Sequence, residues 1–69
     1  MTLLELLKNM RSTYTPIELY NEDCTFIEEG YNHEIKKKYD NNEAFLKKEI
    51  YDISLNGESE QIMITLKND

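Results

Sequence analysis

Apolar residues recur along this chain with two different periods, one helical and one alternating. Near the N-terminus they are three or four residues apart, which places on one helix face Leu3, Leu6, Leu7 and Met10. Thr2 followed three residues later by Glu5 is the sequence of a capping box, T-x-x-E, which typically starts a helix. The pattern therefore predicts a helix over residues 2–10.

Two short extended segments follow, separated by an acidic turn. Residues 17–20 alternate apolar and polar side chains, which predicts a half-buried strand. Residues 21–23 are typical turn residues, and residues 25–30 form the return strand. The register of the turn decides whether Phe26 or Ile27 points inward, and the sequence leaves both arrangements open.

The second half of the chain repeats this plan. A short helix is predicted from residue 31 or 32, with one face formed by Tyr31, Ile35 and Tyr39. An apolar anchor at residues 45–46 precedes a strand over residues 48–55, where Ile50 breaks the alternation and indicates a bulge or a buried strand end. Asn56-Gly57 is a strong hairpin signal, and residues 61–66 form the clearest strand in the sequence.

The order helix, hairpin, helix, hairpin predicts an α+β fold, αββαββ, with an antiparallel sheet covered by helices on one face. At 69 residues, the chain is predicted to form one domain over residues 1–69. A domain of this size buries only about 60% of its unfolded surface, and forming a homodimer is one way to enlarge its core.

Several features of the chain indicate a cytoplasmic protein. Cys24 is the single cysteine, which suits a reducing compartment. The longest apolar runs fall far short of the roughly 20 residues that cross a bilayer. The N-terminal segment is interrupted by Glu5 and lacks the features of a signal peptide.

The charge of the chain is concentrated in the first predicted hairpin. The whole chain carries −6, and residues 12–35 contain six acidic residues and no Lys or Arg. Like charges held together cost stability, so the cluster is a candidate surface for binding a basic partner. Net charge by itself favours the simpler alternative, that the acidic surface promotes solubility. The candidate partner-binding residues are Glu18, Tyr20, Glu22, Asp23, Glu28 and Glu29.

The sequence shows no pattern typical of catalysis, metal binding or cofactor binding. Cys24 and His33 are the only thiol and imidazole, and nothing beside them indicates an activated nucleophile or a zinc site. A glycine-rich phosphate loop is also missing. The run Lys36-Lys37-Lys38 is interpreted as a solvated helix end in an acidic protein. We therefore predict a protein that is not an enzyme and has no cofactor, metal site or catalytic residue.

The chain resembles small acidic proteins encoded by phages and prophages of low-GC Gram-positive bacteria. The resemblance rests on MTLLELLKNMRSTYTPIELYNED, EEGYNHEI, FLKKEIYDISL and the final strand QIMITLKND. Some small acidic phage proteins inhibit host defence or repair enzymes, among them anti-CRISPR proteins and inhibitors of uracil-DNA glycosylase, and several act as DNA mimics. The resemblance implies an inhibitor of the host-defence kind, and it assigns no residue a role.

Together these observations predict an acidic protein-binding module that engages a basic groove of a host protein, such as a nucleic-acid-binding protein. Direct binding to nucleic acid or to an anionic membrane is disfavoured because both are polyanions. Two alternatives stay open. One is a homo-oligomer that sequesters a small molecule or nucleotide, and the other is a phage structural or assembly accessory protein with an exposed apolar helix face around Leu4.

Overall fold

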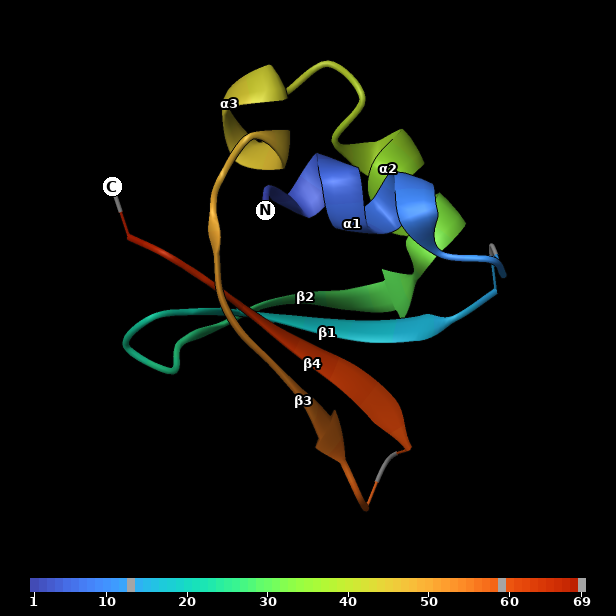
Figure 1. The fold of residues 1–69 in the computed structure, drawn as a ribbon, viewed down its shortest axis with the longest axis vertical. Coiled ribbons are helices and arrows are strands. Elements are labelled where there is room, and N and C mark those ends of the chain that lie inside the picture. The colour runs from blue at the N-terminus through green and yellow to red at the C-terminus, as the bar shows by residue number, and fades with distance from the viewer. Residues whose placement is uncertain (13, 59, 69) are drawn as a thin grey trace.

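A four-stranded sheet with short helices on one side makes up the fold. The computed structural model of the protein describes residues 1–12, 14–58 and 60–68. In these residues the elements are α1 (Leu3–Asn9), β1 (Pro16–Asn21), β2 (Phe26–Tyr31), α2 (Asn32–Lys38), α3 (Glu43–Leu46), β3 (Ile50–Asn56) and β4 (Gln61–Leu66). Figure 1 shows α1 and α2 side by side above β1 and β2, while the β3–β4 hairpin extends away from the helices.

The strand order β2-β1-β4-β3 corrects the predicted architecture. β1 pairs with β2, and β3 with β4, in antiparallel fashion, but β1 and β4 are parallel neighbours at the centre of the sheet. The sheet is therefore mixed, and the prediction of a purely antiparallel sheet is wrong. The element order is αββααββ in the described part of the chain, not αββαββ, because residues 43–46 form a helix of their own.

The parallel pair follows from the path of the chain. After β2, the chain passes through α2 and α3 above the sheet and returns along the far edge as β3. The β3–β4 turn then brings β4 back between β3 and β1, in the direction of β1. Alternation of apolar and polar side chains is the same for either strand direction, so it carried no information about this pairing.

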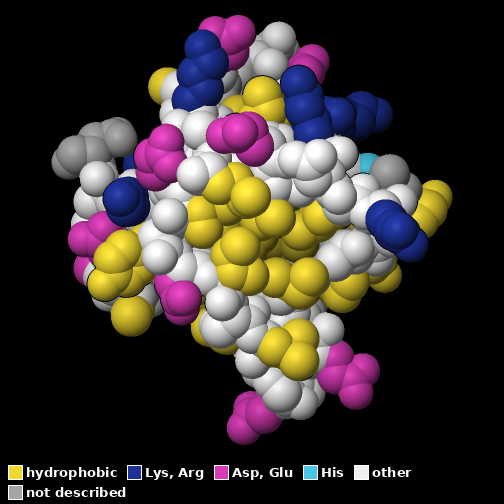
Figure 2. Space-filling model, in the orientation of Figure 1, with side chains coloured by type: hydrophobic (Ala, Val, Ile, Leu, Met, Phe, Trp, Pro, Cys, Tyr) yellow, Lys and Arg dark blue, Asp and Glu magenta, His cyan; other side chains and the backbone are white. Residues whose placement is uncertain are grey.

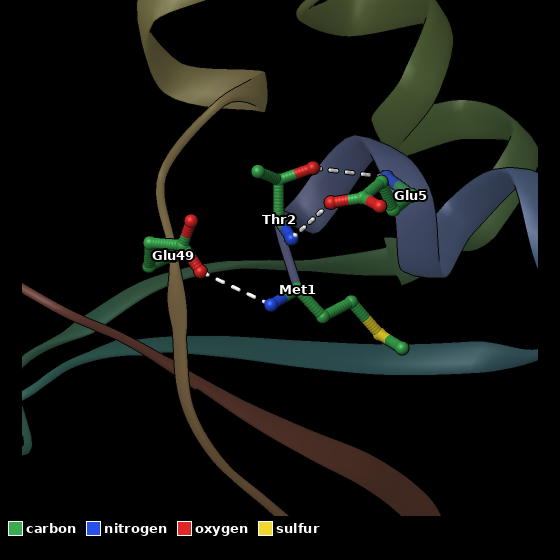
Figure 3. Close-up of polar contacts among 4 residues, drawn as sticks. All are labelled: Met1, Thr2, Glu5 and Glu49. Atoms are coloured by element: carbon green, nitrogen blue, oxygen red, sulfur yellow. Dashed lines mark hydrogen bonds and ion pairs between the residues drawn. The ribbon is translucent and has the colours of Figure 1, made fainter.

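The capping box at the start of α1 is confirmed (Figure 3). The Thr2 hydroxyl accepts a hydrogen bond from the Glu5 backbone N–H at 3.2 Å, and the Glu5 carboxylate accepts one from the Thr2 backbone N–H at 2.9 Å. The bond from the Thr2 backbone holds the pKa of Glu5 below its usual value. Beside the box, the amino group of Met1 pairs with the Glu49 carboxylate at 3.1 Å. The Met1–Glu49 pair links the start of α1 to the segment that leads into β3.

The core lies between the helices and the central strands. Its buried apolar residues, among those described, are Leu3, Leu7, Ile17, Leu19, Ile35, Leu46, Ile64 and Leu66. The helices leave β3 uncovered: Ile53 pairs with Ile64 and shares its face, yet 46% of its surface is exposed. Leu55, two residues further on, is 72% exposed. Figure 2 shows apolar side chains gathered in the middle of the view, between the helices and the β3–β4 hairpin.

Two irregularities set the registers of the hairpins. A shift between Ile50 and Asp52 confirms the bulge predicted at the start of β3. A second shift, between Leu19 and Tyr20, decides the orientation that the sequence left open. Phe26 pairs with Tyr20 and faces away from the core, whereas Ile27 packs against it.

Candidate functional site

The sheet has one face without helices, and part of the acidic hairpin lies on it. Successive side chains of a strand point to opposite faces of the sheet. Because Ile17 and Leu19 face the core, Glu18 and Tyr20 face the opposite side. Their cross-strand partners on β2 are Glu29 and Phe26. The rings of Tyr20 and Phe26 make an edge contact with centroids 5.7 Å apart. We call Glu18, Tyr20, Phe26 and Glu29 the helix-free surface.

Glu18 lies in the middle of this surface and is nearly enclosed by its neighbours. It is 8% exposed, and its Oε1 accepts a hydrogen bond from the Asn56 side chain at 3.0 Å. Met63 is its neighbour on β4, and Glu29 lies opposite on β2. Two carboxylates in facing positions repel each other, which costs stability unless a cation lies near them.

The turn between β1 and β2 carries two more of the predicted residues. Glu22 and Asp23 are exposed there. The Asp23 carboxylate accepts a hydrogen bond from the Thr25 backbone N–H at 3.1 Å, and its bonds with Thr25 hold the pKa of Asp23 below its usual value. Cys24 closes the turn with a positive φ of 70°, and its backbone N–H donates to the Asn21 carbonyl at 2.9 Å. The tip therefore presents an ordered, ionised carboxylate.

Glu28 is separated from the other predicted residues. It faces the helices, where its carboxylate pairs with the Lys38 ammonium and accepts a 3.4 Å hydrogen bond from the Tyr39 hydroxyl. The contact with Lys38 lowers the pKa of Glu28, against the effect of its partial burial, and burial raises the pKa of Tyr39. Of the six predicted residues, the structure thus places three on the helix-free surface, two at the turn and Glu28 in an ion pair on the helix side.

The Glu28–Lys38 pair makes an acid-dependent contribution to stability. Since the folded pKa of Glu28 is lowered, this contribution is present above the ordinary glutamate value of 4.5 and is lost as pH falls through the folded pKa. We expect Glu28→Gln to cost about 0.5–1 kcal/mol at about pH 7, because Lys38 is exposed, and clearly less at about pH 3. Urea unfolding at the two pH values measures this. An equal loss at both would show that the side chain acts through packing.

Phe26 is not among the predicted partner-binding residues, because the sequence left its orientation open. The turn signal at residues 21–23 suggested a tight hairpin, but the bulge beside Tyr20 shifts the return strand and turns Phe26 outward, where it is 51% exposed. A large aromatic residue beside several carboxylates was the available signal. Its direction depended on one residue of register, which the sequence did not give.

The described residues offer no assembled catalytic or metal centre. Cys24 is exposed in the β1–β2 turn, whereas His33 lies on α2 against the rings of Tyr14 and Tyr31. The described part of the chain contains no group of three or more His, Cys, Asp or Glu side chains that could hold a metal ion. None of its helices has the length and apolar character needed to cross a membrane.

Comparisons of the chain with protein-family models, with curated proteins and with solved structures give no match.

Proposed function

We propose that the protein is a non-enzymatic binding module that uses its helix-free surface and the β1–β2 turn to engage a basic surface of another protein. The observation that carries the proposal is the half-exposed ring of Phe26, packed on Tyr20 and adjoining the turn with Glu22 and Asp23. Aromatic anchors inside a polar rim are typical of protein interfaces. A rim of carboxylates favours a cationic partner.

The register of the hairpin adds support. It holds Glu29 opposite Glu18 on the exposed face of the sheet, with no ion pair to either among the described residues. A basic partner would offset this repulsion when it binds. The same steering charge would make association fast and sensitive to salt.

A protein that normally binds nucleic-acid phosphates is the partner class we propose, since its basic groove would accept carboxylates in place of phosphates. The resemblance to phage proteins extends the proposal to an inhibitor of a host enzyme, of the anti-CRISPR or DNA-mimic kind. We further propose that the protein acts in the cytoplasm, where the exposed thiol of Cys24 would stay reduced.

Removing charge from the turn tests this function. We expect Glu22→Gln with Asp23→Asn to weaken partner binding at least about tenfold, since charge-assisted contacts are worth about 1.5 kcal/mol or more. Asn at position 23 keeps an oxygen that can cap Thr25. Affinity capture from a Gram-positive bacterial lysate, at low and high salt, gives the candidate partner, whose affinity is then measured with the purified proteins.

The matched control removes the same charge from the β3–β4 turn, by Glu58→Gln with Glu60→Gln. Phe26→Ser provides a second test that leaves the charge unchanged. The proposal requires that high salt releases the partner and that the β1–β2 turn variant and Phe26→Ser bind it more weakly. The control variant must bind it with unchanged affinity. A partner bound equally by all variants would show that another surface is used.

A further inference from the structure

A groove runs between α1 and α2, on the side of the molecule away from the helix-free surface. Its volume is about 450 Å³, within the range of sites that hold small ligands. Leu7 of α1 and Met10, which directly follows α1, supply apolar lining from one side, and Asn32 and His33 of α2 line it from the other. This groove takes no part in the function proposed above.

The groove is basic although the protein is acidic. Lys8 of α1 and Lys36 and Lys37 of α2 line it, and Asp40 supplies a carboxylate. Within the described residues, none of these three lysines forms an ion pair. In the lysine run, Lys38 alone is paired, with Glu28. Figure 2 shows basic side chains gathered around α2. Three ammonium groups brought together from two helices favour an anionic ligand.

A second, independent observation concerns Asn32, which is only 3% exposed. Its Nδ2 donates hydrogen bonds to the Ser12 carbonyl at 2.6 Å and to the Met10 sulfur at 3.4 Å. Its Oδ1 is buried and has no hydrogen-bond partner in the described part of the chain. A buried acceptor without a donor costs about 1–3 kcal/mol. An N–H or O–H group of a ligand seated in the groove would satisfy it.

Two tyrosine rings lie against His33, which lines the groove. His33 stacks on Tyr31 with an interplanar angle of 9° and centroids 6.0 Å apart, and it makes an edge contact with Tyr14 at 4.9 Å. Both tyrosines are exposed, at 45% and 68%. Exposed rings beside an apolar lining favour a ligand with a flat ring of its own.

We propose that the groove between α1 and α2 binds a nucleotide whose base carries an amino group, as adenine does. The phosphate would lie among the three ammonium groups of Lys8, Lys36 and Lys37. The base would lie against Leu7 and Met10, with its N–H directed to the Asn32 Oδ1. In this arrangement the phosphate meets the ammonium groups and the ring of the base meets the apolar lining. The amino group of the base meets the buried acceptor.

Calorimetric titration of the full chain with AMP, adenosine and inorganic phosphate tests the proposal. AMP is expected to bind at least about tenfold more tightly than either part alone, because only AMP fills both the basic and the apolar regions. Lys36→Gln with Lys37→Gln should weaken AMP about tenfold or more. The charge-matched control, Lys47→Gln with Lys67→Gln, changes lysines outside the groove and should bind AMP as the natural protein does.

A substitution at Asn32 would also remove its bond to Ser12 and could unfold the domain, so its role is tested by NMR. AMP should shift the side-chain amide signal of Asn32, and inorganic phosphate should not. The proposal is overturned if AMP does not bind at millimolar concentration, if phosphate binds as tightly, or if both lysine variants lose AMP equally. It is also overturned if single-stranded oligoadenylate binds far more tightly than AMP, which would indicate a nucleic-acid surface.

Discussion

Ile64→Ala is expected to remove about 3 kcal/mol from the free energy of unfolding. Ile64 is 0% exposed and lies in β4 between Leu19 of β1 and Ile53 of β3. Truncation there leaves a cavity beneath the helices that the rigid centre of the sheet cannot close. Domains of this length have about 3–10 kcal/mol in total, so the variant should be largely or partly unfolded at 37 °C. Urea denaturation followed by circular dichroism measures the loss.

Leu55→Ala is the matched control, because Leu55 lies on the same face of the sheet but on the uncovered strand β3. It is 72% exposed, so its truncation should cost less than about 0.5 kcal/mol. Sedimentation of both proteins is measured as well, because a second copy that covered Leu55 in solution would bury it. Similar losses for the two variants would contradict the burial pattern described here.

Ending the chain after Gly57 is expected to abolish the fold. This change removes β4, which pairs with β1 on one side and β3 on the other. It also removes Ile64 and Leu66 from the core. What remains is an isolated hairpin with helices that have little to pack against, and a two-stranded hairpin is at best marginally stable. Far-UV circular dichroism should show a mostly disordered chain without a cooperative thermal transition.

Removal of residues 68–69 alone is the control for this truncation, since it leaves β4 intact. That shorter deletion should change the midpoint of thermal unfolding by no more than a few degrees. A cooperative transition in the chain that ends at Gly57 would show that β1, β2 and the helices form a stable unit by themselves.

Local signals in the sequence predicted most of the elements. The capping box of Thr2 and Glu5, the turn at Asn56-Gly57 and the bulge after Ile50 each depend on residues close together in the chain, and the structure confirms all three. The sheet order could not be obtained in the same way. Ile17 lies beside Ile62 in a parallel pair, and no local pattern distinguishes that contact from an antiparallel one.

The surfaces, too, could be predicted only as far as local sequence patterns allow. Counting charges identified the acidic hairpin, but the strand register sends Glu28 to the helix side and Phe26 to the opposite face. The lysine run lies exposed in the last turn of α2, as predicted. Lys38 pairs there with Glu28, and Lys36 and Lys37 line a groove together with Lys8 of α1. Local patterns do not show the ion pair or the groove, because each is formed by residues from separate elements.

The central position of β4 also constrains when the protein can fold during its synthesis. The ribosome releases β1, β2 and α1 to α3 before β4, so β1 emerges with one edge unpaired and the core still lacks Ile64 and Leu66. Contacts between distant segments form slowly, and exposed apolar strands promote aggregation meanwhile. The nascent chain should therefore resist protease only once β4 has left the exit tunnel, and until then it would be a substrate for chaperones.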